Sequence, residues 1–370
     1  MVAGLLTNGV RAEQIGVFFS AEGELKAVPR ELPAGMDALT AALQALAAGP
    51  TDMEQAQGLV SAFPAGTTIE QLRIEQDTVF IEFSSALLTF GMDEERLEQV
   101  YRQVQGTLAQ FDLDRNLRLT VAGALLSAYL PPTSRGWLKE GEAVPTPANE
   151  PVTTATGLAG KKVSISPGHG RYWHGDTWYY DRGIYCAPLN SEDDHNDEIA
   201  RYLDVFLRQD GAVTKVYRCI DKSYGTFTQT GDAWWRISAA YWLKQTGYPC
   251  PVYASQTGDC NLGTGANEYS DTVRSRPLAA DYDNTDAHIA IHTNAYAGNC
   301  YGTSCPNGTI TYYDTSSGYG AVGQSLAQNV QNGMINVIRT QYADSTWRDR
   351  GTGDAAGQFE CQHRAGALGR

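Results

Sequence analysis

The sequence predicts two domains: a smaller α+β domain followed by an α/β domain with a mixed or parallel sheet flanked by helices. A chain of 370 residues is long enough for two domains of ordinary size. Residues 12–130 mix strand and helix periodicities, whereas strands and helices alternate from residue 161 to the end at 370. Residues 131–160 between them are rich in Pro, Thr, Ala and Glu, which is typical of a linker.

The first domain is predicted from short apolar runs separated by turn residues. The expected elements are a strand at 15–19, a helix at 36–46 ended by Gly49-Pro50, paired strands at 69–74 and 79–83, a helix at 93–111 and a strand at 117–121. In the second helix, Leu97, Val100, Val104 and Leu108 lie on one stripe. These apolar residues are best explained as core, and no catalytic cluster stands out among them.

The second domain is predicted from strands that alternate with amphipathic helices. The expected elements are strands at 161–165, 213–216, 287–291 and 309–313, a helix with Ile199, Leu203, Phe206 and Leu207 as its apolar stripe, and a helix at 322–338. This order favours a doubly wound sheet, in which sites lie at the carboxyl ends of the strands. His169 and His292 both follow the end of an expected strand.

Three segments far apart in the chain each place one good metal ligand where a strand hands over to a loop or helix. They are Ser-Pro-Gly-His-Gly at 166–170, Ser-Glu-Asp-Asp-His-Asn at 191–196 and Ile-Ala-Ile-His-Thr-Asn at 289–294. His169, Glu192 and His292 would supply two imidazoles and a carboxylate, with a fourth position left to water. This is the usual ligand set of a hydrolytic Zn²⁺ site.

Other polar residues near these segments offer weaker alternatives. His174 and His195 lie close to the candidate ligands in sequence, whereas His288 shares a strand face with His292 and is expected to pack. Asp193 and Glu198 are expected on solvated faces of a loop and a helix.

Net charge, apolar runs and cysteine content limit the partners and the cellular compartments that fit this chain. The net charge of −14 argues against nucleic acid or an anionic membrane as partner, and no apolar run approaches the ~20 residues of a transmembrane segment. Residues 1–11 show no signal peptide. Of seven cysteines, Cys250 with Cys260 and Cys300 with Cys305 are either short disulfides or free thiols, and the odd total leaves at least one thiol without an intrachain partner.

The first domain resembles the GerMN domain of sporulation, germination and lipoprotein-like envelope proteins. The resemblance rests on the order of elements and on Leu-Ala-Ala-Gly-Pro at 46–50 followed by Ala-Phe-Pro-Ala-Gly-Thr at 62–67. It implies a non-catalytic envelope module that binds or assembles with an envelope protein partner.

Residues 161–351 resemble the zinc-dependent N-acetylmuramoyl-L-alanine amidases of the Amidase_3 type. The matching motifs are Ser-Pro-Gly-His-Gly at 166–170, Glu192 with Asn196, Gly-Ala-Val at 211–213 leading to Arg218, Arg-Pro-Leu-Ala-Ala-Asp at 276–281, Ala-Ile-His-Thr-Asn-Ala at 290–295 and Trp-Arg-Asp-Arg-Gly at 347–351. The resemblance implies Zn²⁺ ligands at His169, Glu192 and His292, with substrate contacts from Asn294 and Arg276. It also implies peptidoglycan as substrate and an extracellular or envelope location.

The tail departs from that family. The family places a general-base Glu on a strand about twenty residues beyond Arg-x-Arg-Gly, and here Glu360 is the only acid in a tail without such a strand. We therefore expect a truncated or frameshifted C-terminus with the general base missing, which typically removes ~10²–10⁴-fold of rate.

Three functions are compatible with these motifs. The first is hydrolysis of the amide between N-acetylmuramic acid and L-alanine. The second is a catalytically impaired peptidoglycan-binding envelope protein that keeps the zinc cleft. The third is a zinc hydrolase acting on another amide, with the aromatic, Cys-containing segment 225–275 shaping the substrate groove.

Overall fold

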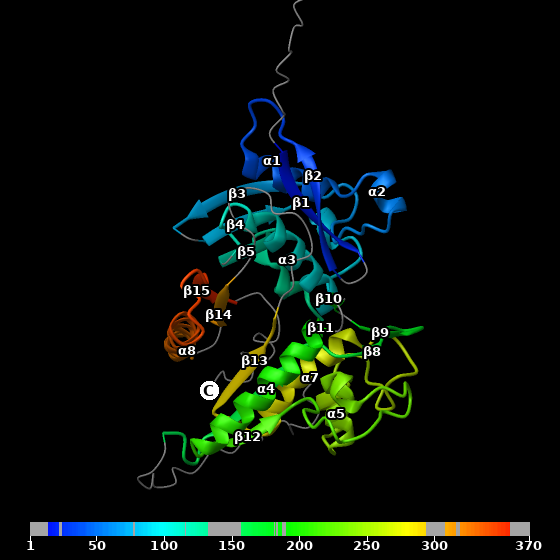
Figure 1. The fold of residues 1–370 in the computed structure, drawn as a ribbon. Helices are drawn as coiled ribbons and strands as arrows, with labels where there is room; N and C mark the ends of the chain where they lie inside the picture. The colour runs from blue at the N-terminus through cyan, green and yellow to red at the C-terminus, as the bar shows by residue number, and fades with distance from the viewer. Residues whose placement is uncertain are drawn as a thin grey trace, which may run out of the picture.

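In the computed structural model, helix α3 (Glu94–Ala109) lies between the other elements of the first domain and the green and yellow elements of the second domain (Figure 1). The structure describes residues 14–131, 157–293 and 308–355, apart from short gaps at 22–23, 77, 115, 181, 183, 187–189 and 316–318. No helix in this described part of the chain combines the length and apolarity that crossing a bilayer requires.

The first domain combines an antiparallel ribbon, a four-stranded mixed sheet and three helices. The ribbon is β1 (Gln14–Ala21) with β2 (Glu24–Glu31), and the sheet runs β3 (Ile69–Glu75), β4 (Thr78–Phe83), β5 (Asn116–Val121) and β6 (Ala124–Leu125). The helices are α1 (Ala38–Ala48), α2 (Asp52–Ala56) and α3. β4 and β5 are parallel, and the other neighbours are antiparallel.

Local sequence explains where the two longer helices begin and how they pack. The carboxylates of Asp37 and Asp93 accept from the third backbone N–H beyond them, Thr40 and Arg96, each at 2.9 Å. Gly49 ends α1 with φ +83°, a conformation that favours glycine. The stripe from Leu97 to Leu108 is buried against β1, β4 and β5, so the predicted elements of this domain are confirmed. β2 was not predicted, because its charged and proline residues break the apolar alternation.

The second domain is built around a parallel sheet in the order β12-β7-β13. Its strands are β7 (Lys162–Pro167), β12 (Val213–Val216) and β13 (Ala287–Ile291), and its helices are α4 (Glu192–Gln209), α5 (Ala239–Gln245), α6 (Cys250–Tyr253) and α7 (Tyr269–Tyr282). Short pairs form between β8 (Tyr172–Trp173) and β9 (Trp178–Tyr179) and between β10 (Ile184–Cys186) and β11 (Asn190–Ser191). Short 3-10 helices lie at Ser85–Leu88, Leu126–Tyr129 and Trp234–Arg236.

The last described elements form a separate layer beside the first domain. β14 (Thr309–Tyr313) pairs in parallel with β15 (Asp349–Asp354), and α8 (Gly320–Gln341) packs on both. Figure 1 places this layer next to β5, and Arg118 of β5 pairs with Asp354 at 2.5 Å. The predicted strand at 309–313 therefore forms, but it pairs with β15 rather than with β13.

The predicted apolar stripe of α4 is wrong as a buried face. Ile199 and Phe206 are exposed, whereas Asn196, Asp197 and Ala200 are buried. Asn196 donates to the Gly168 carbonyl beyond β7, and Asp197 pairs with Lys222 beyond β12. The small Ala200 allows close approach to the sheet. These contacts set the rotation of the helix in place of its larger apolar residues.

The segment between β12 and β13 carries its own aromatic core. Phe227, Trp234 and Tyr241 of this segment pack in one buried cluster with Tyr172 of β8, and Cys250, which forms a disulfide with Cys260, packs against that cluster. Of the two alternatives left open for Cys250 and Cys260, the structure shows the disulfide, whereas Cys300 and Cys305 lie outside the described residues. Residues 132–156 of the predicted linker also lie outside them, so the boundaries of the two domains stay a prediction.

Glu268 is a buried acid within this aromatic core. It is fully buried, and its carboxyl accepts from the backbone N–H of Gly263 at 2.6 Å and from the Tyr241 hydroxyl. Burial, aided by the nearby Asp271 and Asp259, raises the pKa of Glu268 from 4.5 to about 7, despite opposing hydrogen bonds.

We predict that Glu268→Gln removes part of the pH dependence of stability. Below the folded-state pKa the native protein keeps the proton, whereas the unfolded chain loses it above about pH 4.5, so this group's stabilisation declines as pH rises towards 7. Thermal melts from about pH 5 to about pH 8 should show the wild-type melting temperature falling relative to that of the variant. A difference that stays constant across this range would contradict the assignment.

Candidate metal centre

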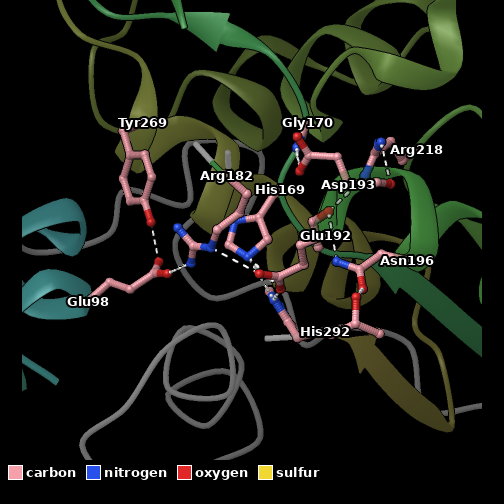
Figure 2. A network of polar contacts seen from close by, with 12 residues as sticks. Glu98, His169, Gly170, Arg182, Glu192, Asp193, Asn196, Arg218, Tyr269 and His292 are labelled. Atoms are coloured by element: carbon pink, nitrogen blue, oxygen red, sulfur yellow. Dashed lines mark hydrogen bonds and ion pairs between the residues drawn. The ribbon is translucent and has the colours of Figure 1, made fainter. Parts of the chain in front are cut away.

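The carboxyl ends of β7 and β13 and the start of α4 bring His169, Glu192 and His292 together (Figure 2). Oε1 of Glu192 lies 2.9 Å from Nε2 of His169 and 3.0 Å from Nδ1 of His292. The two imidazole nitrogens are themselves 3.0 Å apart. Three donor atoms from three distant segments therefore form one small triangle.

The Pro-Gly-His-Gly turn after β7 has a steric basis. A Cβ on Gly168 would lie 2.3 Å from Cε1 of His292, so only glycine lets that ring approach. Gly170 has φ +104°, and a Cβ there would lie 2.7 Å from the Ser238 backbone. His169 itself adopts φ +62°, a conformation that is uncommon outside glycine and that occurs at functional sites.

Buried polar groups hold this turn in place. The Gly168 N–H donates to the Ile291 carbonyl at 2.9 Å, which ties the end of β7 to the end of β13. The Gly168 carbonyl accepts from the buried Arg218 at 2.7 Å and from Asn196 at 3.3 Å. The carboxylate of Asp193 accepts from the Gly170 N–H at 2.9 Å. Asp193 is only 1% exposed, so its predicted solvated position is wrong, because the turn needs this acceptor.

Glu192 is fully buried, yet its surroundings favour the ionised form. Burial alone would raise the pKa of Glu192, but the charges of His169 and Arg182 and hydrogen bonds from both histidines outweigh it. They hold the pKa well below 4.5. His292, by contrast, keeps a third of its side chain exposed, which leaves the group open to solvent on that side.

The donor set and its geometry fit Zn²⁺. Zinc–ligand bonds of about 2.0–2.1 Å in a tetrahedron place donor atoms about 3.4 Å apart. The observed separations of 2.9–3.0 Å need to open by only a few tenths of an ångström. Two nitrogens and one carboxylate oxygen match the preference of zinc, whereas Mg²⁺ and Ca²⁺ prefer all-oxygen sites.

The alternative histidines lie elsewhere in the described chain. His288 stacks on Tyr217, and its Nδ1 lies 2.9 Å from the Ser164 hydroxyl, so it packs as predicted. His174 lies 3.1 Å from the Glu95 carboxylate in the first domain, and His195 is a half-buried residue of α4. Neither belongs to the group of three. Glu198 is exposed, as predicted.

The other predicted site residues have less support. Arg276 is buried within α7, where its Nε donates to the Thr272 carbonyl at 3.2 Å. Asn294 and Glu360 lie outside the described residues. The substrate-binding and general-base roles therefore stay predictions.

Arg182 is a site residue that the sequence did not reveal. Its Nε donates to Oε2 of Glu192 at 3.0 Å, on the side of the carboxylate away from the histidines. It precedes β10 in a stretch of sequence that carries no motif or periodicity. Only the folded chain places this cation beside the carboxylate.

Two family models match this chain, one in each of the two predicted domains. Residues 163–356 match the family model described as N-acetylmuramoyl-L-alanine amidase, and residues 17–127 match the model described as sporulation and spore germination. No curated protein matches the chain.

Two solved structures are similar to the first domain. The tandem GerMN domains of the sporulation protein GerM from Bacillus subtilis match at 21% identity and a TM-score of 0.26, covering 33% of this chain and 43% of that one. The first GerMN domain of the same protein matches at 20% identity and a TM-score of 0.25, covering 30% and 83%. At these TM-scores the two structures add nothing to the family match.

We predict that Gly168→Ala disrupts the three-residue group. The new methyl would overlap the His292 ring, and overpacking of this kind costs about 1–3 kcal/mol of stability. Denaturant unfolding should show that loss, and zinc titration should show weaker binding because His292 is displaced.

Gly333→Ala on α8 is the matched control, because its added Cβ meets nothing within 4 Å. We expect it to keep both stability and zinc binding. Unchanged zinc binding in Gly168→Ala would contradict the steric role of this glycine.

Proposed function

Because the chain belongs to the N-acetylmuramoyl-L-alanine amidase family over residues 163–356, we propose that it is a zinc-dependent enzyme of peptidoglycan. The bond cleaved joins N-acetylmuramic acid to L-alanine. The observation that carries this proposal is the triangle of His169, Glu192 and His292 donor atoms at the ends of β7 and β13. That edge of a parallel sheet is where α/β enzymes place their sites.

His169, Glu192 and His292 would hold the ion, and each residue contributes something different. A zinc ion held there would polarise the amide carbonyl and lower the pKa of its bound water towards about 7. Glu192 supplies a fixed negative charge, since its surroundings keep it ionised. His169 is locked by the turn around it, and the partly exposed His292 faces the side from which substrate can approach.

The location that we propose is the cell envelope or the extracellular space. Both family descriptions fit such a place, and the Cys250–Cys260 disulfide favours an oxidising compartment. The first domain would then serve as a non-catalytic envelope module. An envelope protein that binds this module stays a prediction.

We predict that the full chain, supplied with Zn²⁺, cleaves a muramyl dipeptide, at a rate lowered by about 10²–10⁴-fold if the general base is missing, and that His169→Ala abolishes both cleavage and stoichiometric zinc. The variant removes one of three protein ligands, so the ion loses a quarter of a tetrahedral shell. Released L-alanyl amino groups measure hydrolysis, and elemental analysis measures the metal. His195→Ala is the control, because His195 is a histidine of α4 outside the group of three.

Each outcome separates the candidate functions. Stoichiometric zinc without hydrolysis of any muropeptide would favour the impaired, peptidoglycan-binding alternative. Cleavage of other amides in preference to muropeptides would favour a zinc hydrolase of different specificity. A zinc-free wild-type protein, or equal loss in His195→Ala and His169→Ala, would sink the site assignment.

A further inference from the structure

The first two turns of α3, a helix of the first domain, carry three acids whose side chains contact the second domain. They are Glu94, Glu95 and Glu98, and we call them the α3 acids. Acids at a helix start are ordinarily explained by the helix dipole and remain solvated. Glu94 and Glu98 are instead at most 7% exposed, which demands specific partners for their charges.

All three α3 acids find those partners in the second domain. Glu94 pairs with the buried Arg274 of α7. Glu95 lies 3.1 Å from His174 and accepts from Asn267 at 2.6 Å. Glu98 accepts from the hydroxyl of Tyr269 and pairs with Arg182.

Glu98 differs from the other two acids because its partner, Arg182, also contacts the candidate metal ligand Glu192. Figure 2 shows Arg182 between two carboxylates, with Glu98 on one side and Glu192 on the other. The guanidinium donates through one terminal nitrogen to Glu98 and through Nε to Oε2 of Glu192. Oε1 of Glu192 is left facing His169 and His292.

We propose that the first domain forms part of the metal centre, with Glu98 acting through Arg182 as a positioning residue for the Glu192 carboxylate. This inference rests on the proposed function, since it takes Glu192 as a zinc ligand. The first domain is then more than an attached envelope module. Its docking is what completes the support of the site.

The geometry gives the reason for such a device. A guanidinium carries five donors in a rigid fork and prefers to grip a carboxylate through both oxygens. Glu98 accepts from one terminal nitrogen of that fork, and Nε donates to one oxygen of Glu192. Without the charge of Glu98, Arg182 is free to take both oxygens of Glu192 and so to compete with a cation for Oε1.

The charges favour the same conclusion. Arg182 is only 6% exposed, so its positive charge beside a divalent cation needs compensation. Glu98 supplies a second negative charge, and the series Glu98, Arg182 and Glu192 therefore carries a net −1 towards the site. Neutral Gln at position 98 would leave that series with no net charge and weaken the attraction for a cation.

The test measures zinc affinity of the full chain by competition with a chromophoric chelator. We expect Glu98→Gln to raise the Kd for Zn²⁺ by about 10-fold to 100-fold, the usual effect of removing an outer partner of a metal ligand. Glu94→Gln is the matched control, since it breaks a buried interdomain ion pair on the same helix that does not lead to Glu192. Circular dichroism and thermal melts report whether each variant is folded.

A double-mutant cycle separates positioning from general docking. In an Arg182→Met background, Glu98→Gln should change the Kd by less than about twofold, because the residue through which Glu98 acts is gone. The visible spectrum of the Co²⁺-loaded protein should shift in Glu98→Gln and stay unchanged in Glu94→Gln.

Two results would overturn the inference while leaving the proposed function intact. One is wild-type zinc affinity in folded Glu98→Gln, and the other is an equal loss in Glu94→Gln, which would indicate docking alone. A wild-type chain that binds no zinc would instead contradict the proposed function itself.

Discussion

A completely buried carboxylate at Glu192 is the constraint on which the arrangement of this protein depends. An ionised carboxylate removed from water must be met by cations and donors on every side. Two histidines meet one of its oxygens, and Arg182 meets the other. Arg182 is itself buried and needs Glu98, which belongs to a different domain. One buried charge thus links the ends of two strands, a helix start and a neighbouring domain.

Backbone sterics impose the second condition. The His292 ring reaches the triangle only because Gly168 has no side chain, and His169 points into it only from a left-handed conformation. The carbonyl of Gly168 is fixed by Arg218, a cation buried among backbone acceptors rather than exposed to a ligand. The Pro-Gly-His-Gly motif therefore supplies one candidate ligand, His169, and also, through Gly168, the space that the His292 ring requires.

The sequence was sufficient for most elements and for the three candidate ligands, because both depend on local signals. Apolar periodicity located α3 and β7, and His169 and His292 follow strands whose parallel pairing brings their ends together. It failed where distant polar contacts decide the outcome. The rotation of α4 is set by Asn196, Asp197 and their partners, so the apolar stripe at Ile199 and Phe206 was misleading. Arg182 and the α3 acids meet only in the folded chain, and nothing in residue type or spacing marks them.

The α3 acids also bear on what counts as a self-sufficient piece of this protein. The family match alone would suggest cutting the chain in the segment between the two matched regions and keeping residues from about 157 onward as a minimal enzyme. Such a fragment would lose the α3 acids, so Arg274 would lose Glu94, and Arg182 would keep Glu192 but lose Glu98. Exchange of the first domain for a relative without acids at these positions would have the same effect. The two domains therefore form one structural unit, because acids of the first domain balance the charges of buried arginines in the second.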